Sequence, residues 1–342
     1  MTSDWAPRIV FRTDGGPSIG AGHVARCLAL AAAFNADSRS VGFAASAETF
    51  TTIAALEPVT YDCLMLAGQA EDEPGMMARH WPEGVDVLVV DHYRRDADFE
   101  RGCRTWAKQI VVFDDIANRA HDADILVSSG ATTAHSYRAL VPKNCRILVG
   151  AGHAVIRREF LEARPRALAR RSAKPVERIL VSFGLSEPGQ KTKLALDALA
   201  MAGYRGAVDV ITPSGGSSAA RSNPAVTFHH AGADMAKLMT TADLAIGAAG
   251  STAWERCHLG LPTVLLTDGE NQWGIAATVA GAGAGSYAGS AGAMTPEYLA
   301  SAIVGLIADT EGRRRMAKAA AELVDGRGAE RVVDALKSTS VP

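Results

Sequence analysis

Residues 8–34 read RIVFRTDGGPSIGAGHVARCLALAAAF. An apolar run, a loop with four glycines and a long apolar segment follow one another, which predicts a strand, a turn and a helix. His23 stands directly between the loop and the helix. Two interpretations stay open for this stretch. Either the glycines only turn the chain, or the loop cradles an anion and His23 carries out chemistry beside it.

The first half of the chain repeats this alternation of apolar runs and helical segments. We expect helices at 22–36 and 96–108, and strands at 8–12, 41–45, 85–90, 109–113, 124–129 and 146–150. The runs are apolar almost throughout, which favours a parallel sheet covered by helices on both faces.

The second half restarts the alternation after a basic stretch. Residues 157–176 contain two prolines and no strand pattern, so we place a domain linker at 159–176. Beyond it we expect strands at 177–184, 206–212, 226–230, 242–248 and 262–267, and helices at 190–202, 295–308, 310–324 and 327–338. The predicted fold class is α/β, with two Rossmann-like doubly wound domains, 1–158 and 177–342, facing a central cleft. The last helices are able to pack back on the first domain. Ligands of such sheets lie outside the carboxyl ends of the strands.

Composition narrows the class of partner. The 342 residues carry 35 Lys and Arg against 37 Asp and Glu, a net charge of -2, with no basic stripe for a nucleic acid. The first residues lack a signal-peptide pattern and no window is apolar enough to span a membrane, so we expect a cytoplasmic protein without a membrane partner. The five cysteines form no CxxC pair, and we expect no metal.

Polar residues follow several of the predicted strands of the first domain. Gly20 and Gly22 let a ligand approach the backbone closely, and His23 offers a neutral base at the start of a helix. Asp91, His92 and Tyr93 follow an apolar run and either face the ligand or form a turn in which Asp91 caps the next helix. Asp114 and Asp115 are adjacent; one could orient a neighbour, but cap or turn duty is the preferred interpretation.

The second domain holds the most informative stretch, DLAIGAAGSTAWERCHLGLPTVLLTDGENQ at 243–272. Ser251 and Thr252 open a helix after small residues that include Gly250, which leaves backbone N–H groups suited to a diphosphate. Glu255 could accept hydrogen bonds from ribose hydroxyls. Asn271 and Gln272 start a further helix directed at the same cleft. An earlier loop, SFGLSEPGQKT at 182–192, repeats this design with Gly184 and Ser186. A plain strand-to-helix turn stays open for it.

These motifs together resemble one family, the hydrolases of pseudaminic acid biosynthesis that act on UDP-2,4-diacetamido-2,4,6-trideoxy-β-L-altropyranose. The resemblance rests on the loop ending GAGH with its RCLALA helix, on DHY at 91–93, DDIANRAHDADIL at 114–126, GSTAWERCHLGLP at 250–262 and ENQ at 270–272, and it runs from about residue 8 to 335. That family resembles the two-domain GT-B glycosyltransferases, so the resemblance implies a GT-B-like fold.

The resemblance also implies a reaction. His23 would be the general base that deprotonates water for attack on the anomeric carbon, with inversion and without a metal or other cofactor. The resemblance places Tyr93 and Asn271 at the sugar, and Ser251, Thr252 and Glu255 at UDP. We also expect Asp14, Gly20, Gly22 and Gln272 at the sugar, and Gly184, Ser186 and Gly250 at UDP. The expected partners are the small UDP-sugar and water, and a monomer is compatible with the sequence.

Two alternatives remain at this point. A GT-B glycosyltransferase would use His23 to deprotonate an acceptor hydroxyl, although the sequence shows no basic and aromatic membrane patch of the kind a lipid acceptor requires. A nucleotide-sugar-binding protein without activity is the third possibility, and His23 argues against it. The chain departs from the family at FGLSEP, where Leu185 replaces a glycine and Glu187 an aspartate, and at 151–160, AGHAVIRREF. These changes affect the choice of sugar more than the reaction.

Overall fold

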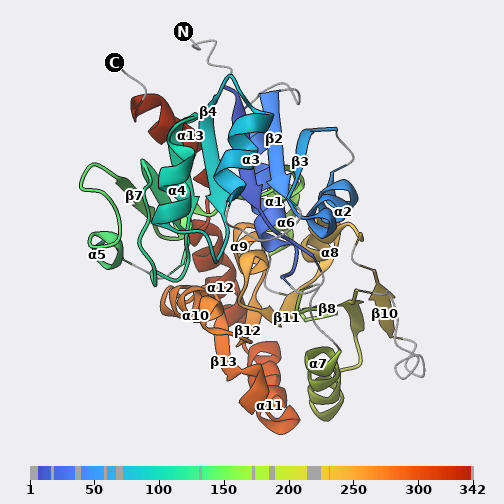
Figure 1. Cartoon of the computed structure of the whole chain (residues 1–342). Coiled ribbons are helices and arrows are strands. Elements are labelled where there is room, and N and C mark those ends of the chain that lie inside the picture. Colours follow the sequence, from blue (N-terminus) through green and yellow to red (C-terminus); the bar gives the residue numbers. More distant parts are fainter. Residues whose placement is uncertain are drawn as a thin grey trace. The chain divides into compact units, whose positions relative to one another are not determined.

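The computed structural model describes residues 7–16, 19–34, 40–57, 60–66, 72–130, 133–171, 174–184, 189–213, 225–230 and 232–339. The chain divides into two compact units, each with its own parallel sheet (Figure 1). The first unit comprises Met1–Arg157 together with Arg327–Pro342, and the second comprises Arg158–Gly326.

The first unit contains a seven-stranded sheet in which every pairing is parallel. Its order is β3-β2-β1-β4-β5-β6-β7. The strands are β1 (Ile9–Thr13), β2 (Val41–Ala45), β3 (Asp62–Met65), β4 (Val85–Asp91), β5 (Ala107–Phe113), β6 (Ile125–Ser128) and β7 (Arg146–Val149). The helices are α1 (Gly22–Ala33), α2 (Ala47–Leu56), α3 (Glu73–His80), α4 (Ala97–Cys103), α5 (Ala134–Tyr137), η3 (Ala151–His153) and α13 (Gly328–Thr339).

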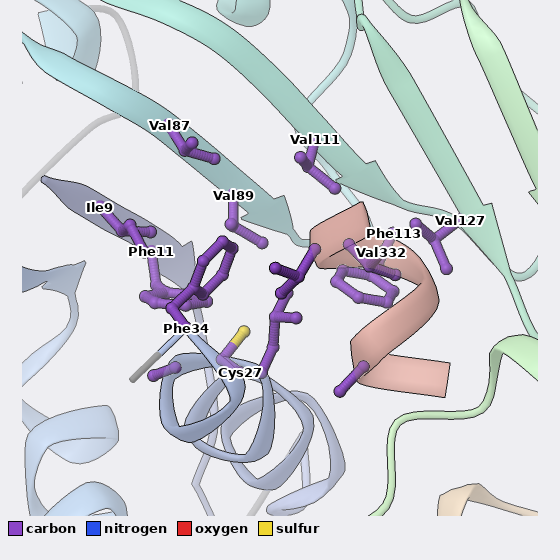
Figure 2. Packing of buried hydrophobic residues seen from close by; sticks show 14 of the residues in the cluster. Ile9, Phe11, Cys27, Phe34, Val87, Val89, Val111, Phe113, Val127 and Val332 are labelled. Carbon is purple, nitrogen blue, oxygen red and sulfur yellow. The ribbon is translucent and has the colours of Figure 1, made fainter. Parts of the chain in front are cut away.

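Apolar side chains on one face of this sheet pack against α1 and α13. Figure 2 shows Phe11, Val89 and Phe113 of three neighbouring strands directed toward Cys27 of α1 and Val332 of α13. All five side chains are buried, which explains why the central strands are apolar along their length. The other face has its own buried cluster, which includes Trp81 and Trp106.

The second unit contains a six-stranded parallel sheet with the order β10-β9-β8-β11-β12-β13. The strands are β8 (Arg178–Ser182), β9 (Ala207–Ile211), β10 (Val226–His229), β11 (Leu244–Ala248), β12 (Thr263–Thr267) and β13 (Ser286–Ser290). The helices are α6 (Arg158–Arg170), α7 (Gln190–Met201), α8 (Met235–Thr241), α9 (Ser251–His258), α10 (Glu270–Gly281), η5 (Ala291–Ala293), α11 (Pro296–Ala308) and α12 (Thr310–Leu323).

These two sheets confirm the predicted α/β class with two Rossmann-like halves. Three details differ from the expectations. Helix α4 ends at Cys103, because β5 begins at Ala107 and takes the end of the expected 96–108 helix. Strands β3 and β13 were not predicted; they are edge strands whose residues are exposed or half-buried and lack a continuous apolar run. Of the stretch expected to be a linker, 159–176, the residues up to Arg170 belong to α6, a helix of the second unit.

The chain returns to the first unit at its end. Helix α13 lies on α1 and η3, and its Ala329, Val332, Val333, Ala335 and Leu336 are buried in the core of that unit. Within the described ranges, no helix is both long and apolar enough to cross a membrane.

Candidate active site

The strand order of each sheet reverses at one point. In the first unit this switch lies between β1 and β4, where Thr13 pairs with Asp91 at the ends of the two strands. The glycine loop follows β1, and His92 and Tyr93 follow β4. Ligands of doubly wound sheets bind at the switch point, outside the carboxyl ends of the strands. The sequence motifs of the first unit therefore lie where this fold binds ligands.

The glycine loop is closed by its own backbone. Gly16 and Gly20 exchange two backbone hydrogen bonds of 3.1 and 2.7 Å. Gly20 has a φ of +87°, a conformation that strains any residue with a Cβ atom. A Cβ atom on Gly15 would lie 2.6 Å from Cγ2 of Val24, so this glycine lets the loop pack against α1. The loop thus delivers His23 to the first turn of α1, which begins at Gly22.

His23 is held by a buried carboxylate. Its Nδ1 lies 2.5 Å from Oδ1 of Asp91, whose side chain is fully buried. A carboxylate accepts hydrogen bonds, so this contact places the proton of the neutral ring on Nδ1. Nε2 then carries the lone pair, and within the described part of the chain it makes no hydrogen bond. The pair Asp91–His23 therefore has the geometry of an oriented general base.

Arg26 keeps Asp91 ionised. Its Nε donates to Oδ2 of Asp91 at 2.8 Å, and its Nη2 donates to Oδ1 at 2.7 Å. Burial favours the neutral acid, but the charge of Arg26 and the hydrogen bonds from His23 and Arg26 outweigh it and hold the pKa of Asp91 well below its usual range. The same guanidinium donates from Nη1 to Asp115 at 2.8 Å and stacks over the ring of Phe113. Two carboxylates and an aromatic ring therefore fix Arg26.

Tyr93 lies beside the imidazole. Its ring meets that of His23 edge-on, with centroids 4.6 Å apart and an angle of 88° between the planes. The side chain is 38% exposed, so it presents a surface next to His23 that a ligand can contact. This position agrees with the sequence-based assignment of Tyr93 to the substrate, which stays a prediction.

Asp14 belongs to a buried network of charges. It accepts a hydrogen bond of 2.9 Å from Nε2 of His92 and pairs with Arg12, whose Nε also donates to Glu73 at 2.8 Å. Arg95 completes the network through Glu73. Burial opposes the charge of Asp14, but His92 and Arg12 lower its pKa well below the usual range. The structure thus assigns Asp14 internal partners, which support the loop that it precedes.

Asp114 and Asp115 bind different partners. Asp114 accepts from the backbone N–H groups of Ile116 and Ala117, both at 3.1 Å, and so supports a turn in which Ala117 has a φ of 57°. Asp115 binds Arg26. The expected turn role therefore fits Asp114, and the expected orienting role fits Asp115.

The second unit repeats the switch point between β8 and β11. Gly184 follows β8 with a φ of +93°, and Ser186, Leu185 and Glu187 lie outside the described residues. Helix α9 follows β11 with Gly250 as its N-cap. Neither this helix nor α7, which starts after Gly189, has a side-chain cap or an acid in its first turn. Their first N–H groups and positive dipole ends are suited to an anion.

The predicted nucleotide residues of α9 differ in exposure. Ser251 is exposed and Thr252 is half-buried at the start of the helix, whereas Glu255 is buried one turn later. At the next strand end, Gln272 of α10 accepts a hydrogen bond of 3.1 Å from the backbone N–H of Asp268, so its amide already supports the loop. Asn271 is half-buried in the same turn.

Sequence reasoning did not connect Arg26 or Asp91 with His23. For Asp91 it left open a place facing the ligand or a helix cap, and for Asp115 it left open a turn or the orientation of an unnamed neighbour. Spacing offered one signal, because His23 and Arg26 are three residues apart and share a face of α1.

The described residues contain no group of three or more His, Cys, Asp or Glu side chains that could hold a metal ion.

The chain is similar in sequence to several known proteins. No model of a known protein family matches it. It is 25% identical over 280 residues to an uncharacterized protein of Methanocaldococcus jannaschii. This alignment covers 78% of this chain and 56% of that protein. It is 29% identical to the UDP-2,4-diacetamido-2,4,6-trideoxy-β-L-altropyranose hydrolase of Campylobacter jejuni, over 45% of this chain and 54% of the hydrolase. It is also 26% identical to the spore coat polysaccharide biosynthesis protein SpsG of Bacillus subtilis, over 74% of this chain and 76% of that protein. The alignments thus span about half the length of the first two relatives.

Solved structures establish the fold class. MurG of Acinetobacter baumannii superposes with a TM-score of 0.66 at 16% identity, over 97% of this chain and 100% of that one. The UDP-GlcNAc 2-epimerase of Neisseria meningitidis, bound to UDP-GlcNAc, gives a TM-score of 0.61 at 13% identity, over 96% of this chain and 100% of that one. The chain therefore has the two-domain, Rossmann-like fold of the GT-B enzymes.

Proposed function

We propose that the chain is an enzyme that hydrolyses a UDP-sugar at its anomeric C–O bond, with inversion and without a metal. The observation that carries the proposal is the Asp91–His23 pair at the switch point of the first unit. The full-length GT-B fold and the partial match to the Campylobacter jejuni hydrolase support the choice of a nucleotide sugar. The specific substrate proposed is that hydrolase's UDP-2,4-diacetamido-2,4,6-trideoxy-β-L-altropyranose.

In the proposed reaction, Nε2 of His23 removes a proton from water as the oxygen attacks the anomeric carbon. The bond from that carbon to the phosphate oxygen breaks, and UDP departs with the electron pair. Asp91 accepts the Nδ1 hydrogen bond throughout and stabilises the imidazolium that forms. UDP is a good leaving group, so fixed dipoles at the diphosphate suffice and a second carboxylic acid is not needed.

In the first unit, we assign contacts with the sugar to Tyr93 and the glycine loop. In the second unit, we assign Asn271 of α10 to the sugar. We assign the diphosphate to the uncapped start of α9 at Gly250, Ser251 and Thr252, with Gly184 and Ser186 of the preceding loop. Glu255, one turn into the helix, is assigned to the ribose.

The test is NMR of the purified protein with the UDP-diacetamido-trideoxy-altrose, with EDTA present and no acceptor. Loss of the anomeric-phosphate signal, with free sugar and UDP formed, is the expected result, and the first anomer to appear reports the stereochemistry. Binding without turnover would contradict hydrolysis and indicate a glycosyltransferase that lacks its acceptor. Exchange to an epimeric UDP-sugar without release of UDP would indicate an epimerase.

A further inference from the structure

Arg256 is a buried cation that the proposed reaction leaves without a role. It lies on α9, its side chain is 1% exposed, and no ion pair of this residue occurs within the described part of the chain. Burial lowers the pKa of Arg256 to about 10, which still leaves the guanidinium charged at neutral pH. The buried carboxylate of Glu255, the preceding residue, acts on this charge through space but forms no ion pair with it. A buried charge without a directly bonded counter-charge is costly, so its retention calls for an explanation.

The guanidinium lies directly beneath the turn from β11 to α9. Its Nη2 donates to the backbone carbonyl of Ala248, and its Nη1 lies 3.4 Å from Oγ1 of Thr252. A Cβ atom on Gly247 would lie 2.8 Å from Nη1, so glycine at this position gives the guanidinium its space. Nε has no hydrogen-bond partner among the described residues. The positive charge of Arg256 therefore lies next to the turn at which α9 begins.

Other buried arginines of the chain are compensated differently. Arg12 and Arg95 share the carboxylate of Glu73. Arg313 forms no ion pair either within the described ranges, but it donates to the carbonyls of Leu306, Ile307 and Lys174 and so caps the end of α11. Arg256 has one carbonyl, one distant hydroxyl and an unused Nε. Its charge is compensated least of the four.

We propose that Arg256 is a positioning residue for the diphosphate of the bound nucleotide, and that the ligand's negative charge is its missing counter-charge. This inference rests on the proposed function. The Nη1 donation occupies a lone pair of the Thr252 hydroxyl, so the hydroxyl proton is left to be donated to a phosphate oxygen. The charge of Arg256 and the positive dipole end of α9 both attract an anion at the start of this helix. Because Arg256 is buried, water screens its charge little.

The experiment compares the binding of UDP with that of uridine by calorimetry. In Arg256→Gln, which keeps an N–H donor in the side chain, we expect the affinity for UDP to fall roughly 10- to 100-fold, because a weakly screened positive charge near the diphosphate is lost. The affinity for uridine should stay unchanged, because uridine carries no phosphate. Arg313→Met is the matched control: it removes another buried arginine of the same unit and should leave the ratio of the two affinities as in the wild type.

If Arg256→Gln does not fold, a second variant, Arg256→Lys, tests the same inference. Arg256→Lys retains the charge at pH 7, but a buried lysine loses its proton far more readily than an arginine. Its affinity for UDP should therefore fall between pH 7 and 8.5, while that of the wild type stays constant.

The outcomes separate the two proposals. A wild-type protein that binds UDP, with an unchanged UDP-to-uridine ratio in Arg256→Gln or a pH-independent Arg256→Lys, overturns the role of Arg256 alone. A wild-type protein that binds neither UDP nor uridine contradicts the proposed function and this inference with it.

Discussion

His23 and Asp91 lie 68 positions apart in the chain, yet Nδ1 of the one is 2.5 Å from Oδ1 of the other. The parallel pairing of β1 with β4 creates this contact, because it sets Thr13 opposite Asp91 at the strand ends. The imidazole is thus oriented by a carboxylate that the fold itself supplies.

Replacing Asp91 by Asn should lower turnover by roughly 10²-fold or more, because the amide can present its NH2 group to Nδ1 and favour the wrong tautomer. The affinity for UDP should be unchanged. The matched control is Asp115→Asn, which also removes a carboxylate from Arg26, although the hydrogen bond of Asp115 goes to Arg26 and not to His23. Steady-state rates of the two variants decide the matter: equal losses would mean that Asp91 acts only through Arg26.

Replacing His23 by Ala should lower turnover by roughly 10²–10⁴-fold, the range for losing a general base. Calorimetry should show UDP binding at the wild-type level, because the nucleotide is assigned to the other unit. A variant that turns substrate over at a near-normal rate would exclude His23 as the base.

Replacing Glu255 by Ala should weaken UDP binding roughly 10-fold, through loss of hydrogen bonds from ribose hydroxyls to a charged acceptor. Glu322→Ala serves as the control, since Glu322 is an exposed residue of the same unit. Titration calorimetry measures both. Wild-type affinity in Glu255→Ala would place the nucleotide elsewhere.

Replacing Glu73 by Gln should lower the free energy of unfolding by about 3 kcal/mol or more, because Arg12 and Arg95 would remain buried without their shared carboxylate. Urea denaturation measures the change. Asp98→Asn is the control: its pair with Arg101 is exposed, and we expect a loss below about 1 kcal/mol. Similar losses in both variants would contradict a special role for the buried network.

Because His258 is buried, we expect the second unit to lose folding stability in acid. Burial, and after it the charge of Arg164, lowers the pKa of this histidine from 6.5 to about 4. Between pH 4 and 6.5, His258 is therefore protonated in the unfolded chain and neutral in the folded unit. Stability is fully present above pH 6.5 and falls as the pH decreases toward 4, by on the order of 3 kcal/mol. Urea midpoints across this range should fall less steeply in His258→Asn than in the wild type or in the exposed control His80→Asn. Parallel slopes would show that other groups govern the acid response.

Strong apolar runs made most of the fold predictable. β2 was predicted at its exact bounds, and strands such as β4 and β12 to within a residue or so, because central parallel strands are buried on both faces. β3 and β13 escaped detection since an edge strand needs no such run. Helix α13 was predicted as a helix, but periodicity does not specify the unit on which its apolar face packs.

The candidate site was predictable as single motifs and not as a constellation. A glycine loop, a histidine and a small-residue helix start each carry a local signal. The contact of Asp91 with His23 depends on which strands are neighbours, and the burial of Arg256 depends on the space above Gly247. Both follow from the three-dimensional arrangement, and neither has a spacing that a single sequence reveals.

The place of α13 has a consequence for biosynthesis. A ribosome makes residues 328–339 only after the whole second unit, so the nascent first unit emerges with the α13-binding surface of its core uncovered. That surface stays open to solvent, or to a chaperone, for the time needed to synthesise some 170 further residues, which is about 10–30 s at typical elongation rates. The first unit, although it is translated first, is the last to be completed.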